Sequence, residues 1–216
     1  MYSYHPHIIS LSQGVAALDV LEKIKQTPGI QIFDTIENQL KELVKCRNPK
    51  VKFKENPEIY QHLIEDYLSG RSQDSIGNWV HYPWNNTLIH LLPEEEFVEI
   101  RTNRNKYKIT EAQQQALRKK IVGVIGLSVG QTVAVTMAME RMFGEIRLAD
   151  FDEIDLSNLN RVRTHLINIG INKAVIVARE IAEIDPYLKV TVYENGITEE
   201  NIDDFFTLNG TLDALV

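Results

Sequence analysis

Residues 121–130 read IVGVIGLSVG, and this stretch decides the fold of the second half of the chain. Its first five residues are a short apolar run of the kind that a buried parallel strand shows. Gly126 and Gly130 follow, and a helix is predicted after them. The next strand is predicted at residues 146–149, directly before Asp150. A strand, a glycine loop, a helix and a second strand in this order are typical of an α/β fold.

The same alternation continues toward the end of the chain. Asn172 is predicted to cap a helix that ends at Asp185, and a third strand is predicted at residues 190–192. Thr198 is then predicted to cap a further helix, and residues 212–216 to begin a fourth strand. Repeated strand–helix–strand units form right-handed parallel sheets with helices on both faces. We therefore predict an α/β domain at residues 117–216, with a Rossmann-like, doubly wound and mostly parallel sheet. Because the fourth strand stops within its run, we expect this sheet to be truncated at its C-terminal end.

Residues 1–116 are predicted to form a smaller, mixed α/β domain of unknown role. Six of the seven prolines of the chain lie in it. Two strands, at residues 79–82 and 88–92, are predicted to form a hairpin. Asp34 and Glu37 are spaced as a capping box for a helix that begins between them.

The composition is that of an ordinary globular chain, with 44% hydrophobic and 25% charged residues. Its 23 basic and 30 acidic residues give a net charge of −7, so no global basic field attracts nucleic acid or an anionic membrane. Residues 121–139 carry no charge, but their glycines and polar residues argue against a membrane-spanning helix. Cys46 is the one cysteine, which excludes an internal disulfide and CxxC zinc sites. We predict a reduced, cytoplasmic protein.

The glycine loop at residues 126–130 allows three interpretations. In the first, small residues and a helix N-terminus cradle the phosphates of a nucleotide, and Asp150, 20 residues after Gly130, binds its ribose. In the second, GLSVG is a nucleophile elbow with Ser128 as the nucleophile, although His165 is the one histidine that follows it. In the third, the loop is a tight turn that binds no ligand.

The stretch that separates these interpretations is residues 150–161, DFDEIDLSNLNR. Three further carboxylates follow Asp150, and amide and cationic side chains come after them at Asn158, Arg161, Arg163 and Lys173. Negative charge on a transferring phosphoryl group calls for fixed cationic donors. A loop that returns such side chains to a phosphate-binding turn therefore suits a triphosphate whose α-phosphate is attacked.

With these residues in place, the sequence from about residue 117 to residue 216 resembles the ubiquitin-activating-enzyme-like superfamily, the ThiF/MoeB/HesA group. The pattern of that group is a glycine loop, then D-F-D-x-[VI]-x-x-S-N-L-x-R, then a lysine that opens the next helix. Residues 126–130, residues 150–161 and Lys173 match it in order. The first 116 residues resemble the N-terminal part of bacterial ThiF-domain proteins that continue into a nitroreductase-like domain.

The resemblance implies ATP-dependent adenylation of a carboxylate, typically the C-terminal glycine of a small ubiquitin-like sulfur-carrier protein, with ATP and Mg²⁺. It places Asp150 at the ribose. The residues that it places at the phosphates are Asn158, Arg161 and Lys173. Those that it places elsewhere around the nucleotide are Gly126, Ser128, Gly130 and Asp152. Arg161 and Lys173 are the predicted catalytic residues. Members are often homodimers in which an upstream arginine reaches the phosphates of the partner subunit, and Arg104 is the nearest candidate for that role.

Two alternatives stay open at this point. In the first, the chain is a nucleotide-binding or interaction module with a degenerate, non-catalytic ThiF fold. In the second, it is an NAD(P)-binding Rossmann domain. No cysteine follows the glycine loop, so this chain holds no thioester-forming nucleophile. In the family, a metal-coordinating aspartate follows the position of Val216. We therefore expect no metal ligand within these residues, weak ATP binding, and no adenylation by the 216 residues alone.

Overall fold

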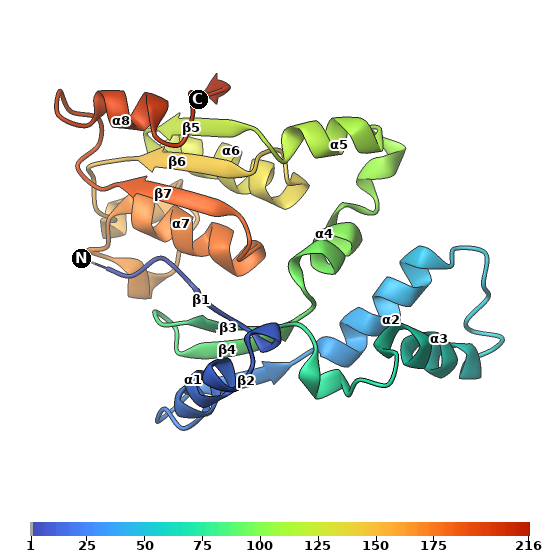
Figure 1. Cartoon of the computed structure of the whole chain (residues 1–216). Coiled ribbons are helices and arrows are strands. Elements are labelled where there is room, and N and C mark those ends of the chain that lie inside the picture. The colour runs from blue at the N-terminus through green and yellow to red at the C-terminus, as the bar shows by residue number, and fades with distance from the viewer. Residues whose placement is uncertain (1) are drawn as a thin grey trace. The chain divides into compact units, whose positions relative to one another are not determined.

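The computed structural model of the chain describes residues 2–216 (Figure 1). They form two compact units, one of residues 6–104 and one of residues 2–5 together with residues 105–216. Helix α5 (Glu111–Leu117) belongs to the second unit, which therefore begins ahead of residue 117, where the sequence places the boundary. The domain division drawn from the sequence stays a prediction.

The unit of residues 6–104 contains a mixed sheet with the strand order β1-β3-β4-β2. Its strands are β1 (His7–Ser10), β2 (Gln31–Asp34), β3 (Asn78–Tyr82) and β4 (Thr87–Leu91). β3 pairs antiparallel with both β1 and β4, and β2 pairs parallel with β4. The predicted hairpin is therefore present, and its turn contains Asn86 with a φ of 54°. A mixed α/β fold is confirmed for this part of the chain.

Four helices accompany that sheet: α1 (Val15–Lys25), α2 (Ile36–Arg47), α3 (Glu58–Leu68) and α4 (Glu94–Thr102). α1 packs on the sheet through Leu21, and α2 and α3 share a second apolar core. The predicted capping box of α2 is wrong, because the N-cap is Thr35 and its side chain makes no capping bond. Asp34 instead ends β2, and its carboxylate accepts from the backbone N–H of Ile36.

The other unit contains a parallel sheet with the strand order β7-β6-β5-β8. Its strands are β5 (Ile121–Ile125), β6 (Glu145–Ala149), β7 (Lys189–Tyr193) and β8 (Ala214–Leu215). Every neighbouring pair is parallel. The chain starts at β5, moves outward through β6 to β7, and then crosses to the other side of β5. The predicted Rossmann-like, doubly wound order is confirmed.

Helices cover both faces of this sheet, as Figure 1 shows. α6 (Leu127–Glu140) and α7 (Lys173–Ile184) pack on the face that carries Ile146 and Leu148. α8 (Ile202–Thr207) covers the opposite face, where Phe205 packs against Ala149. The predicted cap of α8 at Thr198 is wrong, because Asn201 is its N-cap and accepts from the backbone N–H of Thr198.

Arg147 of β6 is fully buried on the α8 side of the sheet. Its Nε donates to Glu145 Oε1 at 3.1 Å, and its Nη1 donates to the carbonyl of Phe205 at 2.6 Å. Its Nη2 donates to the carbonyls of Leu208 and Gly210. A charged side chain thus fixes the end of α8 and the turn that leads into β8.

Residues 2–5 pack with residues 105–216, although the whole unit of residues 6–104 lies between them in the sequence. Tyr4 lies against the apolar core between the sheet and its two long helices. Arg179 of α7 donates from Nε to the carbonyl of Ser3 at 2.8 Å, and its guanidinium lies 5.7 Å from the centre of the Tyr2 ring. The second unit is therefore built from two separate parts of the sequence.

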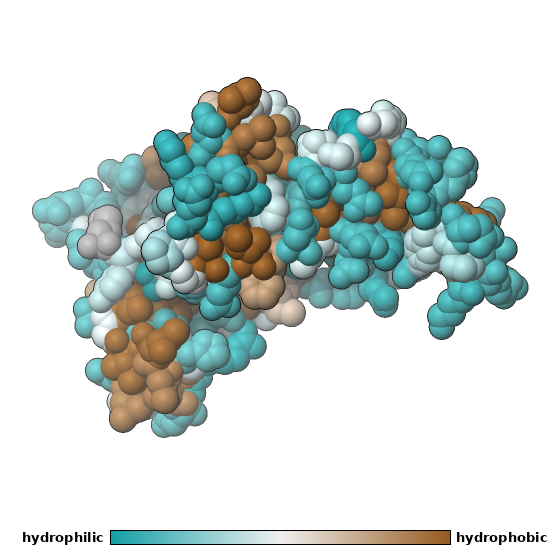
Figure 2. All heavy atoms as spheres, turned by 90° about the horizontal axis from the view of Figure 1, so that it is seen from below, coloured by the Kyte–Doolittle hydropathy of each residue, from teal (hydrophilic) through white to brown (hydrophobic). Residues whose placement is uncertain are grey.

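Hydrophobic side chains form several brown areas among teal polar side chains on the face shown in Figure 2. Val129, Phe151 and Ile167 are among the large hydrophobic residues with most of their surface exposed. Within residues 2–216, no helix combines the length and the apolar character that crossing a membrane requires.

Candidate functional site

A cleft of about 480 Å³ lies where β5 and β6 end. Its lining comes from the ends of these strands, the start of α6 and the segment after β7: Ile125, Gly126, Ser128, Val129, Ala149, Asp150, Phe151, Asp152, Gly196 and Ile197. Open parallel sheets bind their ligands outside the carboxyl ends of the strands. Four of the nucleotide-site residues predicted from the sequence therefore line one cleft at that edge.

The glycine loop that the sequence predicts at residues 126–130 is shorter in the structure. α6 begins at Leu127, so Gly126 is its N-cap, with a φ of 84° that favours glycine, and Ser128 lies in its first turn. Gly130 is also helical and buried, and a Cβ there would lie 2.6 Å from Cγ1 of Val124. Gly130 thus allows α6 to pack closely on β5, and the prediction that it lies in a phosphate loop is corrected.

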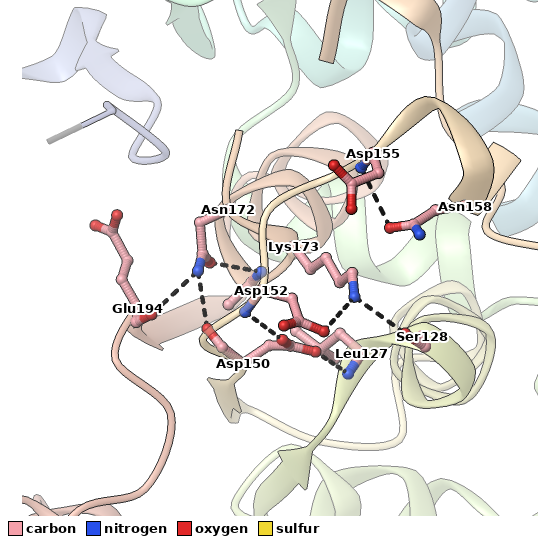
Figure 3. Close-up of polar contacts among 10 residues, drawn as sticks. Leu127, Ser128, Asp150, Asp152, Asp155, Asn158, Asn172, Lys173 and Glu194 are labelled. Atoms are coloured by element: carbon pink, nitrogen blue, oxygen red, sulfur yellow. Dashed lines mark hydrogen bonds and ion pairs between the residues drawn. The ribbon is translucent and has the colours of Figure 1, made fainter. Parts of the chain in front are cut away.

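Asp150 connects the end of β6 to the start of α6. Its carboxylate is buried and accepts from the backbone N–H of Leu127 at 2.6 Å and of Asp152 at 2.8 Å (Figure 3). The first N–H groups of a helix have no partner within that helix, and an acidic side chain there is favourable. Asp150 therefore fixes the helix N-terminus at the cleft, and its predicted contact with a ribose stays a prediction.

Lys173, the first residue of α7, brings three predicted site residues together. Its ammonium donates to Asp152 Oδ2 at 2.7 Å and to Ser128 Oγ at 3.2 Å (Figure 3). The side chain of Lys173 is only 5% exposed, whereas that of Asp152 is 52% exposed. Lys173 is therefore held at the cleft by two polar side chains, a position suited to a negative ligand.

Asn158 and Arg161 lie on the connection between β6 and α7. Asn158 is buried in the short 3₁₀ helix at residues 156–160, and its Oδ1 accepts from the backbone N–H of Asp155 at 3.3 Å. Arg161 is exposed and donates to Oδ1 of the neighbouring Asn160 at 3.0 Å. Among the described residues, no hydrogen bond joins either side chain to Lys173, Asp152 or Ser128. Their predicted contacts with phosphates stay predictions.

Arg104 ends the unit of residues 6–104 and has an exposed side chain. It follows α4 by two residues. Its predicted role toward the phosphates of a partner subunit stays a prediction.

The sequence did not identify Phe151, Ile197 and Asn172 as site residues. Phe151 and Ile197 supply apolar walls to the cleft. Phe151 lies two residues after β6 and Ile197 four residues after β7. The segments that follow the carboxyl ends of parallel strands line ligand sites, so these positions could have signalled their role. Asn172 caps α7 as predicted, with Oδ1 accepting from the backbone N–H groups of Ala174 and Val175.

Tyr193 ends β7 on the α8 side of the sheet. Burial raises the pKa of its hydroxyl, and the negative charge of Asp204 raises this pKa further. The ring meets Phe205 edge-on, with 5.2 Å between the ring centres. Tyr193 therefore stays neutral at physiological pH and serves as an apolar support behind the cleft.

Comparison with known proteins gives relatives for both parts of the chain. A protein of Mycobacterium tuberculosis (strain CDC 1551 / Oshkosh), named uncharacterized protein MT1398, is 38% identical over 186 residues, which are 86% of this chain and 24% of that protein. Only 116 residues of this chain lie from residue 101 onward, so at least 70 of the 186 aligned residues lie before residue 101. The similarity to this protein therefore extends into the unit of residues 6–104.

Two relatives with more informative names share less of the chain. The tRNA threonylcarbamoyladenosine dehydratase of Bacillus subtilis (strain 168) is 31% identical over 106 residues, 48% of this chain and 41% of that protein. Ubiquitin-like modifier-activating enzyme 5 of Drosophila willistoni is 30% identical over 94 residues, 43% of this chain and 23% of that protein. The chain thus spans less than half the length of each of these relatives.

The model of the ThiF family matches residues 101–216, which are more than half of the chain. This match contains α6, the DFD segment and Lys173, the features on which the resemblance rests. The chain belongs to the ThiF family, within the superfamily of ubiquitin-activating-like enzymes.

Proposed function

We propose that the cleft binds ATP and that the protein uses it to adenylate a carboxylate. The observation that carries this proposal is the ammonium of Lys173, held by Asp152 and Ser128 beside the N-terminus of α6. A helix N-terminus and a fixed cation together favour the negative charge of phosphates. The exposed Arg161 supplies a second cation on the connection between β6 and α7.

The rest of the cleft suits the nucleoside part of ATP. Its volume of about 480 Å³ lies in the range of small-molecule sites. Ile125, Val129, Phe151 and Ile197 offer apolar surface for a base. Asp150 lies at the same edge and keeps acceptor capacity on its carboxylate oxygens for ribose hydroxyls, in addition to the two backbone bonds.

In the proposed reaction, a carboxylate oxygen of the substrate attacks the α-phosphorus of ATP. A bond forms between that oxygen and the α-phosphorus, the bond from the α-phosphorus to the bridging oxygen breaks, and pyrophosphate leaves with the electron pair. Negative charge spreads over the phosphoryl oxygens as this happens, and fixed cationic donors stabilise it. Lys173 and Arg161 are the residues that we assign to this role.

The sequence resemblance implies that Mg²⁺ accompanies the bound ATP. Among residues 2–216, no three His, Cys, Asp or Glu side chains gather into a group that could hold a metal ion. Mg²⁺ commonly uses one or two carboxylates together with substrate phosphates. Asp152, a carboxylate that lines the cleft, is bonded to Lys173. The charge stabilisation that we propose rests on Lys173 and Arg161.

The substrate that we propose is the C-terminal glycine of a small ubiquitin-like carrier protein. The sequence resemblance supports it, and so does the name of the relative ubiquitin-like modifier-activating enzyme 5. A homodimer in which Arg104 reaches the phosphates of the partner subunit, and a cytoplasmic location, belong to the same proposal.

The proposal is tested by ligand-induced stabilisation. ATP with Mg²⁺, at ten times its dissociation constant, is expected to raise the free energy of unfolding by about 1.4 kcal/mol, because it binds only the folded chain. NAD⁺ is expected to give no comparable change. The measurement is thermal unfolding with each nucleotide and with none. Stabilisation by NAD⁺ but not by ATP would contradict the proposal and favour an NAD(P)-binding domain.

Substitutions of Ser128 separate nucleotide binding from hydrolase chemistry. Ser128→Ala and Ser128→Gly are expected to retain ATP binding, because this position needs only a small side chain. Ser128→Val is expected to weaken ATP binding, since a branched side chain at the helix N-terminus blocks the approach of phosphates to the backbone. Calorimetric titration with ATP measures these effects. Covalent labelling of Ser128 by a fluorophosphonate would instead support a nucleophile elbow.

A further inference from the structure

Asn172 uses every hydrogen-bonding position of its side chain. Its Oδ1 accepts from the backbone N–H groups of Ala174 at 2.8 Å and Val175 at 3.4 Å, which caps α7. Its Nδ2 donates to the carbonyl of Asp150 at 2.8 Å and to the carbonyl of Glu194 at 3.1 Å (Figure 3). The residue is only 7% exposed, so water has little access to these bonds.

The two acceptors of Nδ2 lie at the ends of different strands of the sheet. Asp150 directly follows β6, and Glu194 directly follows β7. The same Asp150 caps α6 through its carboxylate. One side chain therefore connects the start of α7 to the ends of two strands and, through Asp150, to the start of α6.

We propose that Asn172 is a positioning residue for the ATP site, an inference that rests on the function proposed above. Lys173 is the next residue, and its ammonium must reach across to Ser128 in α6. By fixing the start of α7 against β6 and β7, the amide of Asn172 holds Lys173 at the cleft. Asn172 acts through Lys173 and does not itself touch the phosphates.

Helix capping alone does not account for asparagine at this position. Asp and Ser cap helices about as well as Asn. A carboxylate, however, has no N–H to donate, and an amide is the side chain that combines two donors with an acceptor. The substitution Asn172→Asp therefore keeps the cap of α7, removes both bonds to the strands, and turns a carboxylate oxygen toward two carbonyls.

The first measurement is the reactivity of the Lys173 amine. Under native conditions, an amine-acylating reagent is expected to modify Lys173 about 10- to 30-fold faster in Asn172→Asp than in the parent chain, because two buried hydrogen bonds no longer oppose local opening. Peptide mass spectrometry follows the modification. Asn105→Asp is the matched control, because Asn105 Nδ2 also donates twice, to Gln114 Oε1 and to the carbonyl of Glu140, outside the cleft lining. It is expected to leave the reactivity of Lys173 unchanged.

The second measurement is ATP–pyrophosphate exchange by the native protein at its full length. Asn172→Asp is expected to lower kcat about 10-fold and to change the KM for ATP less, because a displaced Lys173 loses its contact with charge that grows in the transition state. In a Lys173→Ala background, the same substitution is expected to cause no further loss.

The outcomes distinguish the two proposals. Equal acylation of Lys173 in Asn172→Asp and in the parent overturns the positioning role, whatever the exchange assay gives. Additive losses in the double variant overturn it as well. Absence of exchange in the parent protein with a carrier would contradict the proposed function, and the acylation result would still test whether Asn172 holds Lys173 in place.

Discussion

Arg147→Met is expected to lower the free energy of unfolding of the unit formed by residues 2–5 and 105–216, here called the ThiF unit, by about 3–5 kcal/mol. The guanidinium is fully buried and satisfies the carbonyls of Phe205, Leu208 and Gly210 together with Glu145. Methionine can occupy part of the volume but donates no hydrogen bond. The buried carbonyl of Phe205 and the partly buried carbonyls of Leu208 and Gly210 would then lose this donor, and Glu145 would keep only Lys189.

Hydrogen exchange of the β5 and β6 amides is the suitable measurement for this prediction. Both tryptophans, Trp79 and Trp84, lie in the unit of residues 6–104, so tryptophan fluorescence reports on the wrong unit. Arg163→Met is the control, because the side chain of Arg163 is 76% exposed and pairs with Glu180 at the surface. Its cost is expected to stay below about 1 kcal/mol. An equal effect of the two substitutions would show that the buried network contributes little.

Lys173→Ala and Arg161→Ala are each expected to slow ATP–pyrophosphate exchange about 10- to 150-fold in the native protein with the proposed carrier. This range corresponds to the loss of one charge-assisted hydrogen bond to the reacting phosphate. Stability is expected to change little, because Arg161 is exposed and because Asp152, freed by Lys173→Ala, is half exposed and stays hydrated.

A matched surface lysine is the control for these variants. Lys108 pairs with Glu140 and is 65% exposed, so Lys108→Ala is expected to leave exchange unchanged. Unchanged exchange in both Lys173→Ala and Arg161→Ala would refute their assignment to the phosphates. A loss in only one of them would restrict the phosphate contact to that residue.

The strands and long helices of the ThiF unit could be predicted because their signals are local. The apolar run of β5 and the cap of α7 at Asn172 need no knowledge of distant residues. The start of α6 could not be predicted in the same way. Its first N–H group, that of Leu127, finds a partner in Asp150, which is 23 residues away, and this contact lets the helix begin directly after Gly126.

The site was predicted in its residue types and not in its contacts. The DFD motif and the lysine identified Asp152 and Lys173, but the bond between them depends on how the connection after β6 folds back. Arg147 shows the converse difficulty. Its alternation with Ile146 and Leu148 places it on the opposite face of the strand, and the distant segment of α8 both buries that face and supplies the carbonyls that accept from Arg147.

The contact between Ser3 and Arg179 has a consequence for how the protein is made. The two residues are 176 positions apart in the chain. A ribosome adds about 5–20 residues per second, so Arg179 is added about 9–35 s after Ser3. The whole unit of residues 6–104 is synthesised within this interval. Ser3 is therefore synthesised before the unit of residues 6–104, but it can reach its place in the fold only after that unit has been made.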